Sequence, residues 1–126
     1  MLIDKEKFAT HLRKNAAKLS QRKCATYVRR ALEAGGARTV GHPVDAKDYG
    51  PVLLRNGYRA LSPQPLETYI PAKGDVAVIQ PTAHGSKSGH IEAYDGKDWI
   101  SDFVQSGFWP GPAYRNEKPS HVIYRP

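Results

Sequence analysis

Residues 75–80, Asp-Val-Ala-Val-Ile-Gln, decide the fold because they form the strongest β-strand signal in the sequence. A loop rich in Gly, Ser and Pro follows at 81–88. Beyond it, short apolar segments alternate with turn residues. We expect strands at 90–94, 99–105 and 121–125, with a three-residue turn at 95–97 between the first two. The C-terminal half therefore predicts an antiparallel β-meander.

The residues before this strand are typical of helices. Asp4 is a helix N-cap candidate, and an apolar stripe follows it to about Ala17. Ser20 is a second N-cap candidate. After it, apolar residues recur at i, i+3, i+4, i+7 and i+8 from Cys24 to Leu32 before a Gly-Gly pair at 35–36 ends the helix. A short helix within 45–57, a strand at 58–61 and an extended connector complete this half. Helices followed by an antiparallel sheet predict an α+β fold.

Length and composition bound the class of protein. The 126 residues, 40% of them hydrophobic, predict one globular domain over 1–126. The net charge of +7 favours anionic partners such as nucleic acid, anionic lipid or cell-wall polymer. We find no nucleic-acid-binding motif. No apolar run is long enough for an integral membrane segment, and the first residues do not form a signal peptide, so we expect synthesis in the cytoplasm.

Cys24 is the only cysteine in the sequence, which excludes an internal disulfide and a Cys-rich zinc site. The periodicity places this thiol on the apolar face of its helix, near the helix start. Partial positive charge at a helix N-terminus favours the thiolate, which is the nucleophilic form of cysteine. Cys24 is therefore a candidate nucleophile, although a lone buried cysteine is also a common small core residue.

The predicted hairpin supplies a base for this thiol. A three-residue turn at 95–97 places His90 directly opposite Asp102 on one face of the sheet. A carboxylate beside an imidazole orients the ring, as the third member of a catalytic triad does. Glu92 lies on the same face and is the competing third residue. His84 and His121 are alternative bases, and His42, beside a proline, fits a turn or the surface.

These segments resemble the CHAP/NlpC-type papain-like cysteine amidases, which cleave amide bonds in bacterial peptidoglycan. The resemblance covers Ser20 to about Gln105. It rests on Cys-Ala-Thr-Tyr-Val at 24–28, Lys-Gly-Asp-Val at 73–76, Gly-His-Ile at 89–91 and a polar residue on the next strand. It implies a papain-like fold of the NlpC type in which Cys24, His90 and Asp102 form the catalytic triad.

Small size, positive charge and the missing signal peptide are similar to type VI secretion amidase effectors. This resemblance implies action on the cell wall of a target bacterium, cleavage of the D-glutamyl–diaminopimelate region of the stem peptide, and a periplasmic immunity protein as partner. In the mechanism we expect, His90 takes the Cys24 proton, the thiolate attacks the amide carbonyl, and the oxyanion lies near the Cys24 N–H. This chemistry needs no metal or cofactor.

Two other classes of function remain open. A cysteine deamidase or transglutaminase-like toxin would use the same triad on a protein substrate. A non-catalytic basic binding module would hold an anionic polymer, and its properties would not depend on Cys24. Trp99, Trp109 and Tyr114 either line a groove or pack in the core.

Overall fold

A computed structural model describes residues 3–126 as helices packed on an antiparallel sheet, which confirms the α+β class. The first half contains α1 (Lys5–Asn15), α2 (Cys24–Ala34), the 3₁₀ helix η1 (Ala46–Asp48), α3 (Gly50–Arg55) and β1 (Arg59–Ala60). The second half contains β2 (Val76–Ile79), β3 (His90–Tyr94), β4 (Trp99–Ile100), α4 (Pro112–Glu117) and β5 (His121–Arg125). None of the helices described is long and apolar enough to cross a bilayer.

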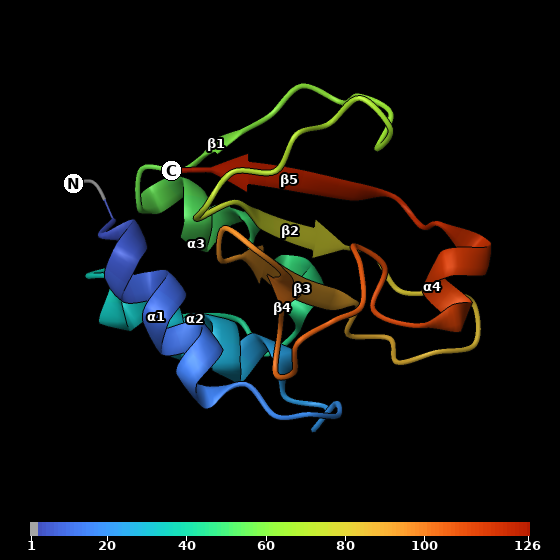
Figure 1. The fold of residues 1–126 in the computed structure, drawn as a ribbon, viewed down its shortest axis with the longest axis horizontal. Coiled ribbons are helices and arrows are strands. Elements are labelled where there is room, and N and C mark those ends of the chain that lie inside the picture. The colour runs from blue at the N-terminus through green and yellow to red at the C-terminus, as the bar shows by residue number, and fades with distance from the viewer. Residues whose placement is uncertain (1–2) are drawn as a thin grey trace.

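All strand pairs are antiparallel, and the sheet order is β1-β5-β2-β3-β4. The predicted meander is correct for β2, β3 and β4. The last strand does not extend it, because β5 returns past α4 to pair with the free edge of β2. In Figure 1 the start of α1 and the C-terminus lie at one end of the sheet and α4 lies at the other.

Two apolar clusters cover the two faces of the sheet. The larger lies under α1, α2 and α3 and includes Phe8, Leu12, Val28 and Leu32, all of them at most 1% exposed. The smaller cluster, on the opposite face, is built on Ala77, Ile79, Trp99 and Ile123. The buried strand β2 contributes to both clusters by alternation, which explains why its sequence is apolar throughout.

The helix starts differ from the sequence predictions in one instructive respect. The Asp4 side chain accepts from the Lys7 N–H at 3.0 Å and caps α1 as expected. Ser20 does not cap α2, which begins at Cys24 after Lys23, and the Lys23 side chain makes no capping hydrogen bond. The start of α2 is held by another part of the chain, described below.

The turn between β3 and β4 has four residues and not the predicted three. Asp95 Oδ1 accepts from the N–H groups of Lys97 and Asp98 at 3.0 and 2.8 Å, and the Asp95 N–H donates to the Asp98 carbonyl at 3.1 Å. Tyr94 therefore pairs with Trp99, and Ala93 pairs with Ile100. The predicted register, which paired His90 with Asp102, is wrong by one residue.

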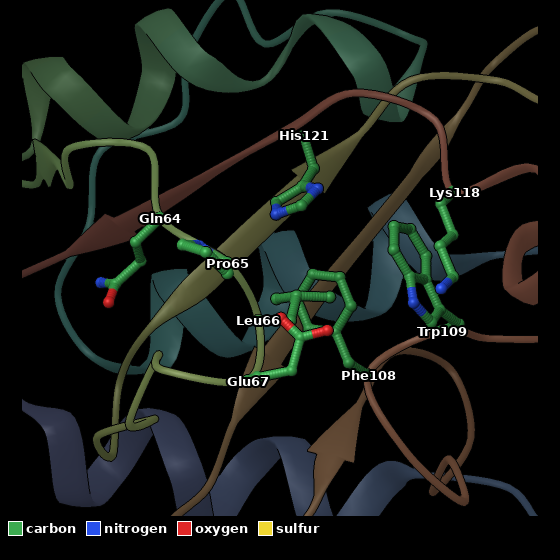
Figure 2. Close-up of a pocket in the computed structure, with 8 residues that line it drawn as sticks. All are labelled: Gln64, Pro65, Leu66, Glu67, Phe108, Trp109, Lys118 and His121. Carbon is green, nitrogen blue, oxygen red and sulfur yellow. The ribbon is translucent and has the colours of Figure 1, made fainter.

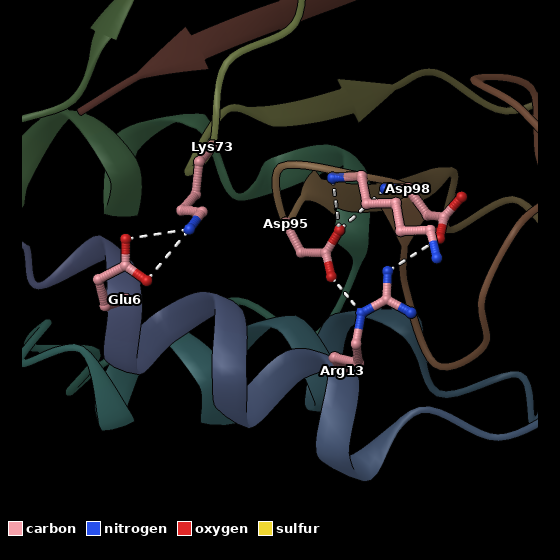
Figure 3. A network of polar contacts seen from close by, with 6 residues as sticks. Glu6, Arg13, Lys73, Asp95 and Asp98 are labelled. Atoms are coloured by element: carbon pink, nitrogen blue, oxygen red, sulfur yellow. Dashed lines mark hydrogen bonds and ion pairs between the residues drawn. The ribbon is translucent and has the colours of Figure 1, made fainter.

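Polar contacts fix α1 against this turn. Arg13 Nε pairs with Asp95, its Nη2 pairs with Asp98 at 2.8 Å, and Lys73 Nζ pairs with Glu6 at 3.0 Å (Figure 3). Asp95 is thus held both by its own turn and by α1. This double constraint fixes the four-residue turn and hence the register of the hairpin.

Candidate active site

Cys24 is the first residue of α2, and its half-buried side chain packs against the edge of the larger apolar cluster. The N–H groups in the first turn of a helix have no partner within the helix and carry partial positive charge. This position therefore favours negative charge on the sulfur and offers N–H donors to a second anion.

His90 begins β3 and is 8% exposed. Gly89, directly before it, has φ +72°, and a Cβ there would lie 2.5 Å from the Ile79 carbonyl oxygen. Only glycine fits this close approach of two strands, so the Gly-His pair places the ring at the start of the strand. Cys24 lies near enough to the ring to help raise the pKa of His90, so the structure places these two predicted residues near each other.

Gln105 fixes the orientation of the ring. Its Oε1 lies 2.9 Å from His90 Nε2, while its Nε2 donates to Glu92 Oε1 at 2.9 Å and to the carbonyls of Gly107 and Phe108 at 3.0 and 3.2 Å. Because all three partners of the amide nitrogen are acceptors, the amide oxygen must face the ring, and His90 Nε2 is the donor. Nδ1 is then the nitrogen left to exchange a proton with the thiol.

Glu92 lies behind this pair and is 0% exposed. Its Oε1 is 3.3 Å from His90 Nε2, and its Oε2 has no hydrogen-bond partner among residues 3–126. Burial raises the pKa of the Glu92 carboxyl above its usual range, opposed by hydrogen bonds with His90 and Gln105. Alternation along β3 predicted that Glu92 shares a face with His90 but is less able to point at the ring, whereas in the structure its carboxylate reaches the ring.

The electrostatics of the site favour a charged ring. Burial opposes positive charge on His90, but hydrogen bonds and charge attraction from Cys24 and Glu92 outweigh burial and raise the pKa of His90 to about 10. A ring that holds its proton at neutral pH can stabilise a thiolate beside it and can donate a proton to a leaving group.

Asp102 does not contact the ring. The chain turns back directly after β4, where the Ser101 N–H donates to the Phe103 carbonyl and Ile100 pairs with Val104. The predicted strand at 99–105 is therefore only two residues long. Asp102, 1% exposed, points instead to the segment before α2, where its Oδ2 accepts from the N–H groups of Gln21 and Lys23.

The other three histidines considered from the sequence have different surroundings. His84 is in an exposed loop, and His42 contacts its neighbour Pro43 and Tyr49 at the surface. His121 packs against Phe108 and Trp109 in the smaller apolar cluster, where burial lowers its pKa. Within residues 3–126, no group of three His, Cys, Asp or Glu side chains is placed to hold a metal ion.

A hollow of about 550 Å³ lies beside the segment that follows Gln105. Residues 64–67 line one part of it, and the rest is lined by Phe108, Trp109, Lys118 and His121 (Figure 2). The Tyr114 ring stands 5.9 Å from the His90 ring, centroid to centroid. Trp109 and Tyr114 thus border the surface near the site, whereas Trp99 is a core residue.

Sequence reasoning did not identify Gln105 as a site residue. It lay at the end of a predicted strand, and the pairing that brings it to His90 depends on the reversal at 101–103. The hydrogen bond from the Gln105 N–H to the Trp99 carbonyl, 2.9 Å long, closes that reversal. Only the side-chain type, an amide able to accept and donate, could have suggested the role.

Two crystal structures resemble this chain along nearly its whole length. Both are of the type VI effector-immunity complex Tae3-Tai3 from Ralstonia pickettii. The selenomethionine form matches with a TM-score of 0.80 and 44% identity over 94% of this chain and 98% of that chain. The native form matches with a TM-score of 0.81 and 41% identity over 97% and 98%. No family model and no curated protein matches the chain.

Proposed function

Because the chain belongs to the Tae3 family of type VI effectors, we propose that it is an antibacterial peptidoglycan amidase that uses Cys24 as its nucleophile. The Tae effectors are peptidoglycan amidases. The single observation that carries the cysteine mechanism is the position of the only thiol of the sequence, at the start of α2 and near a buried histidine that is held by Gln105 and whose pKa is raised to about 10. This pair provides a nucleophile and a proton donor in one place.

The reaction follows from the geometry of the pair. His90 Nδ1 takes the proton of Cys24, and the thiolate attacks the carbonyl carbon of a stem-peptide amide. The tetrahedral oxyanion accepts from the Cys24 N–H at the start of α2. Nδ1–H protonates the leaving amine, the C–N bond breaks, and a thioester remains. Water, deprotonated by His90, then hydrolyses the thioester and frees the thiol.

Gln105 and Glu92 support the ring in this scheme. Gln105 Oε1 holds the Nε2–H, and the Glu92 carboxylate stabilises the imidazolium from 3.3 Å. These contacts favour the alternative third residue, Glu92, over Asp102 as the group acting on His90. The overall arrangement, with a helix start carrying the cysteine and a strand start carrying the histidine, supports a papain-like domain of the NlpC type spanning 1–126.

Membership of the Tae3 family also bears on where the protein acts and on its partner. We propose that the chain acts in the periplasm of a target bacterium, on the D-glutamyl–diaminopimelate bond of the stem peptide. The similar crystal structures are effector-immunity complexes, which supports a periplasmic immunity protein that covers Cys24 and His90.

Digestion of purified peptidoglycan, followed by mass spectrometry of the fragments, tests the proposal. Wild type should release fragments with one new amine and one new carboxyl group. Cys24→Ala and His90→Ala should release none, while His84→Ala, a change to an exposed histidine outside the site, should behave as wild type. Activity above a few per cent in Cys24→Ala would exclude the thiol as nucleophile. Intact peptidoglycan with wild type would favour a protein substrate.

A further inference from the structure

The segment before the nucleophile is held by a buried carboxylate from the far end of the chain. A single oxygen of Asp102, Oδ2, accepts from the N–H of Gln21 at 2.6 Å and from the N–H of Lys23 at 2.9 Å. Lys23 is the residue directly before Cys24. Asp102 therefore holds the backbone directly before α2 from 79 positions away in sequence, whereas Asp4 caps α1 through an N–H of its first turn.

The backbone around this contact is strained and doubly anchored. Arg22, between the two donors, has φ +57°, a left-handed conformation that is unfavourable for a residue with a side chain. Its own N–H donates to Ser20 Oγ at 3.2 Å. The main chain of Asp102 adds a second anchor, since its carbonyl accepts from the Ala17 N–H at 2.9 Å. Such a conformation persists only where surrounding contacts impose it.

We propose that Asp102 is a positioning residue for the nucleophile. Its carboxylate holds the turn at 20–23 so that α2 begins at Cys24 and the sulfur faces the His90 ring. The inference rests on the proposed function, in which the thiol and the ring exchange a proton. In this proposal Asp102 positions Cys24, whereas Gln105 and Glu92 orient the His90 ring.

Two substitutions at this position separate the roles. Asp102→Asn keeps an oxygen that can accept both N–H groups, and its amide nitrogen can face Ser101 Oγ, which lies 3.4 Å from Oδ1. Asp102→Ala keeps neither. We expect kcat for Asn to stay within about fivefold of wild type, since neutral hydrogen bonds are roughly half as strong as charged ones. For Ala we expect a loss of about 100-fold, as for a small misplacement of a reacting atom.

The rate of Cys24 alkylation by iodoacetamide at pH 6 reports the position of the sulfur relative to the His90 ring, and its measurement needs no substrate. It should fall about tenfold in Asp102→Ala, because a displaced sulfur loses the imidazolium that favours its thiolate. It should stay close to the wild-type rate in Asp102→Asn, whose pH–rate profile should also be unchanged. This readout keeps the inference testable even if peptidoglycan proves not to be the substrate.

Asp75→Asn is the matched control. Asp75 is also a fully buried carboxylate that binds a backbone N–H, that of Ala72 at 3.0 Å, but its other partners are Tyr69 and Arg125. It should lower the melting temperature without changing alkylation, which separates lost stability from lost positioning. If Asp102→Asn loses 100-fold in kcat or shifts the pH–rate profile, Asp102 acts on His90 and the inference is wrong. Wild-type alkylation in a folded Asp102→Ala would also overturn it.

Discussion

Glu92→Gln tests how the buried carboxylate controls the charge of the catalytic ring. Glu92 Oε1 lies 3.3 Å from His90 Nε2, and both side chains are shielded from water. With an effective dielectric constant of about 20, two unit charges at this distance attract each other by roughly 5 kcal/mol. At 1.36 kcal/mol per pKa unit, this energy equals a change of roughly 3.5 in the pKa of His90. Glutamine keeps the shape of the side chain but removes its charge.

The substitution should therefore lower the pKa of His90 from about 10 toward its ordinary value near 6.5. A histidine whose pKa is raised in the folded state contributes stability that is fully present below pH 6.5 and is lost as the pH rises toward 10. Between pH 6.5 and 9, the free energy of unfolding of wild type should fall by roughly 3 kcal/mol from this group. The raised pKa of Glu92 itself acts in the same direction, and glutamine removes that contribution as well.

Urea unfolding at several pH values from 6 to 9, for wild type and Glu92→Gln, measures the effect. Stability of the variant should fall less with rising pH over this range than stability of wild type, because only the contribution of Cys24 to the raised pKa of His90 remains. Glu67→Gln, which removes one exposed carboxylate, is the control for net charge and should follow wild type. Parallel curves for wild type and Glu92→Gln would refute the reasoning, because they would show that Glu92 does not set the charge of the ring.

Two further predictions concern the cell and the α1 contacts. Wild type fused to a signal peptide should lyse bacteria that express it, whereas the unfused chain and the exported Cys24→Ala variant should not; equal toxicity without export would point to an intracellular amide. Arg13→Ala should lower the free energy of unfolding by about 1 kcal/mol, and by less at high salt, because the Arg13 side chain that pairs with Asp95 and Asp98 is 41% exposed. Differential scanning calorimetry at low and high salt measures this difference. An effect that does not depend on salt would contradict an electrostatic origin.

Local sequence signals predicted the elements that carry the reacting pair. The apolar period from Cys24 and the Gly-His pair at 89–90 placed a thiol at a helix start and an imidazole at a strand start, and in the structure α2 begins at Cys24 and β3 begins at His90. Both features depend on contacts within a few residues or on steric limits at glycine. This is why a single sequence was sufficient to find them.

The choice of the third catalytic residue depended on the register of the β3–β4 hairpin, which local sequence signals specify poorly. An Asp-Gly-Lys turn favours three residues, but Asp95 accepts hydrogen bonds within a four-residue turn and pairs with Arg13, 82 positions earlier in the sequence. The early end of β4 depends equally on a distant partner, Ala17. Helix α4 at 112–117 was missed because the Pro-Gly-Pro run at 110–112 includes its first residue, although proline is acceptable in the first turn of a helix.

The shortness of the two outer strands affects how copies of this protein behave in concentrated solution. An exposed strand edge is a template for pairing with another chain, and long flat edges promote aggregation. Here β1 and β4 have two residues each, β1 carries Arg59, and the segment after β4 is bridged to Ala17. Neither edge offers a continuous row of free N–H and C=O groups. Together with a net charge of +7, which makes copies repel one another, this geometry favours a monomer that stays dispersed at high concentration.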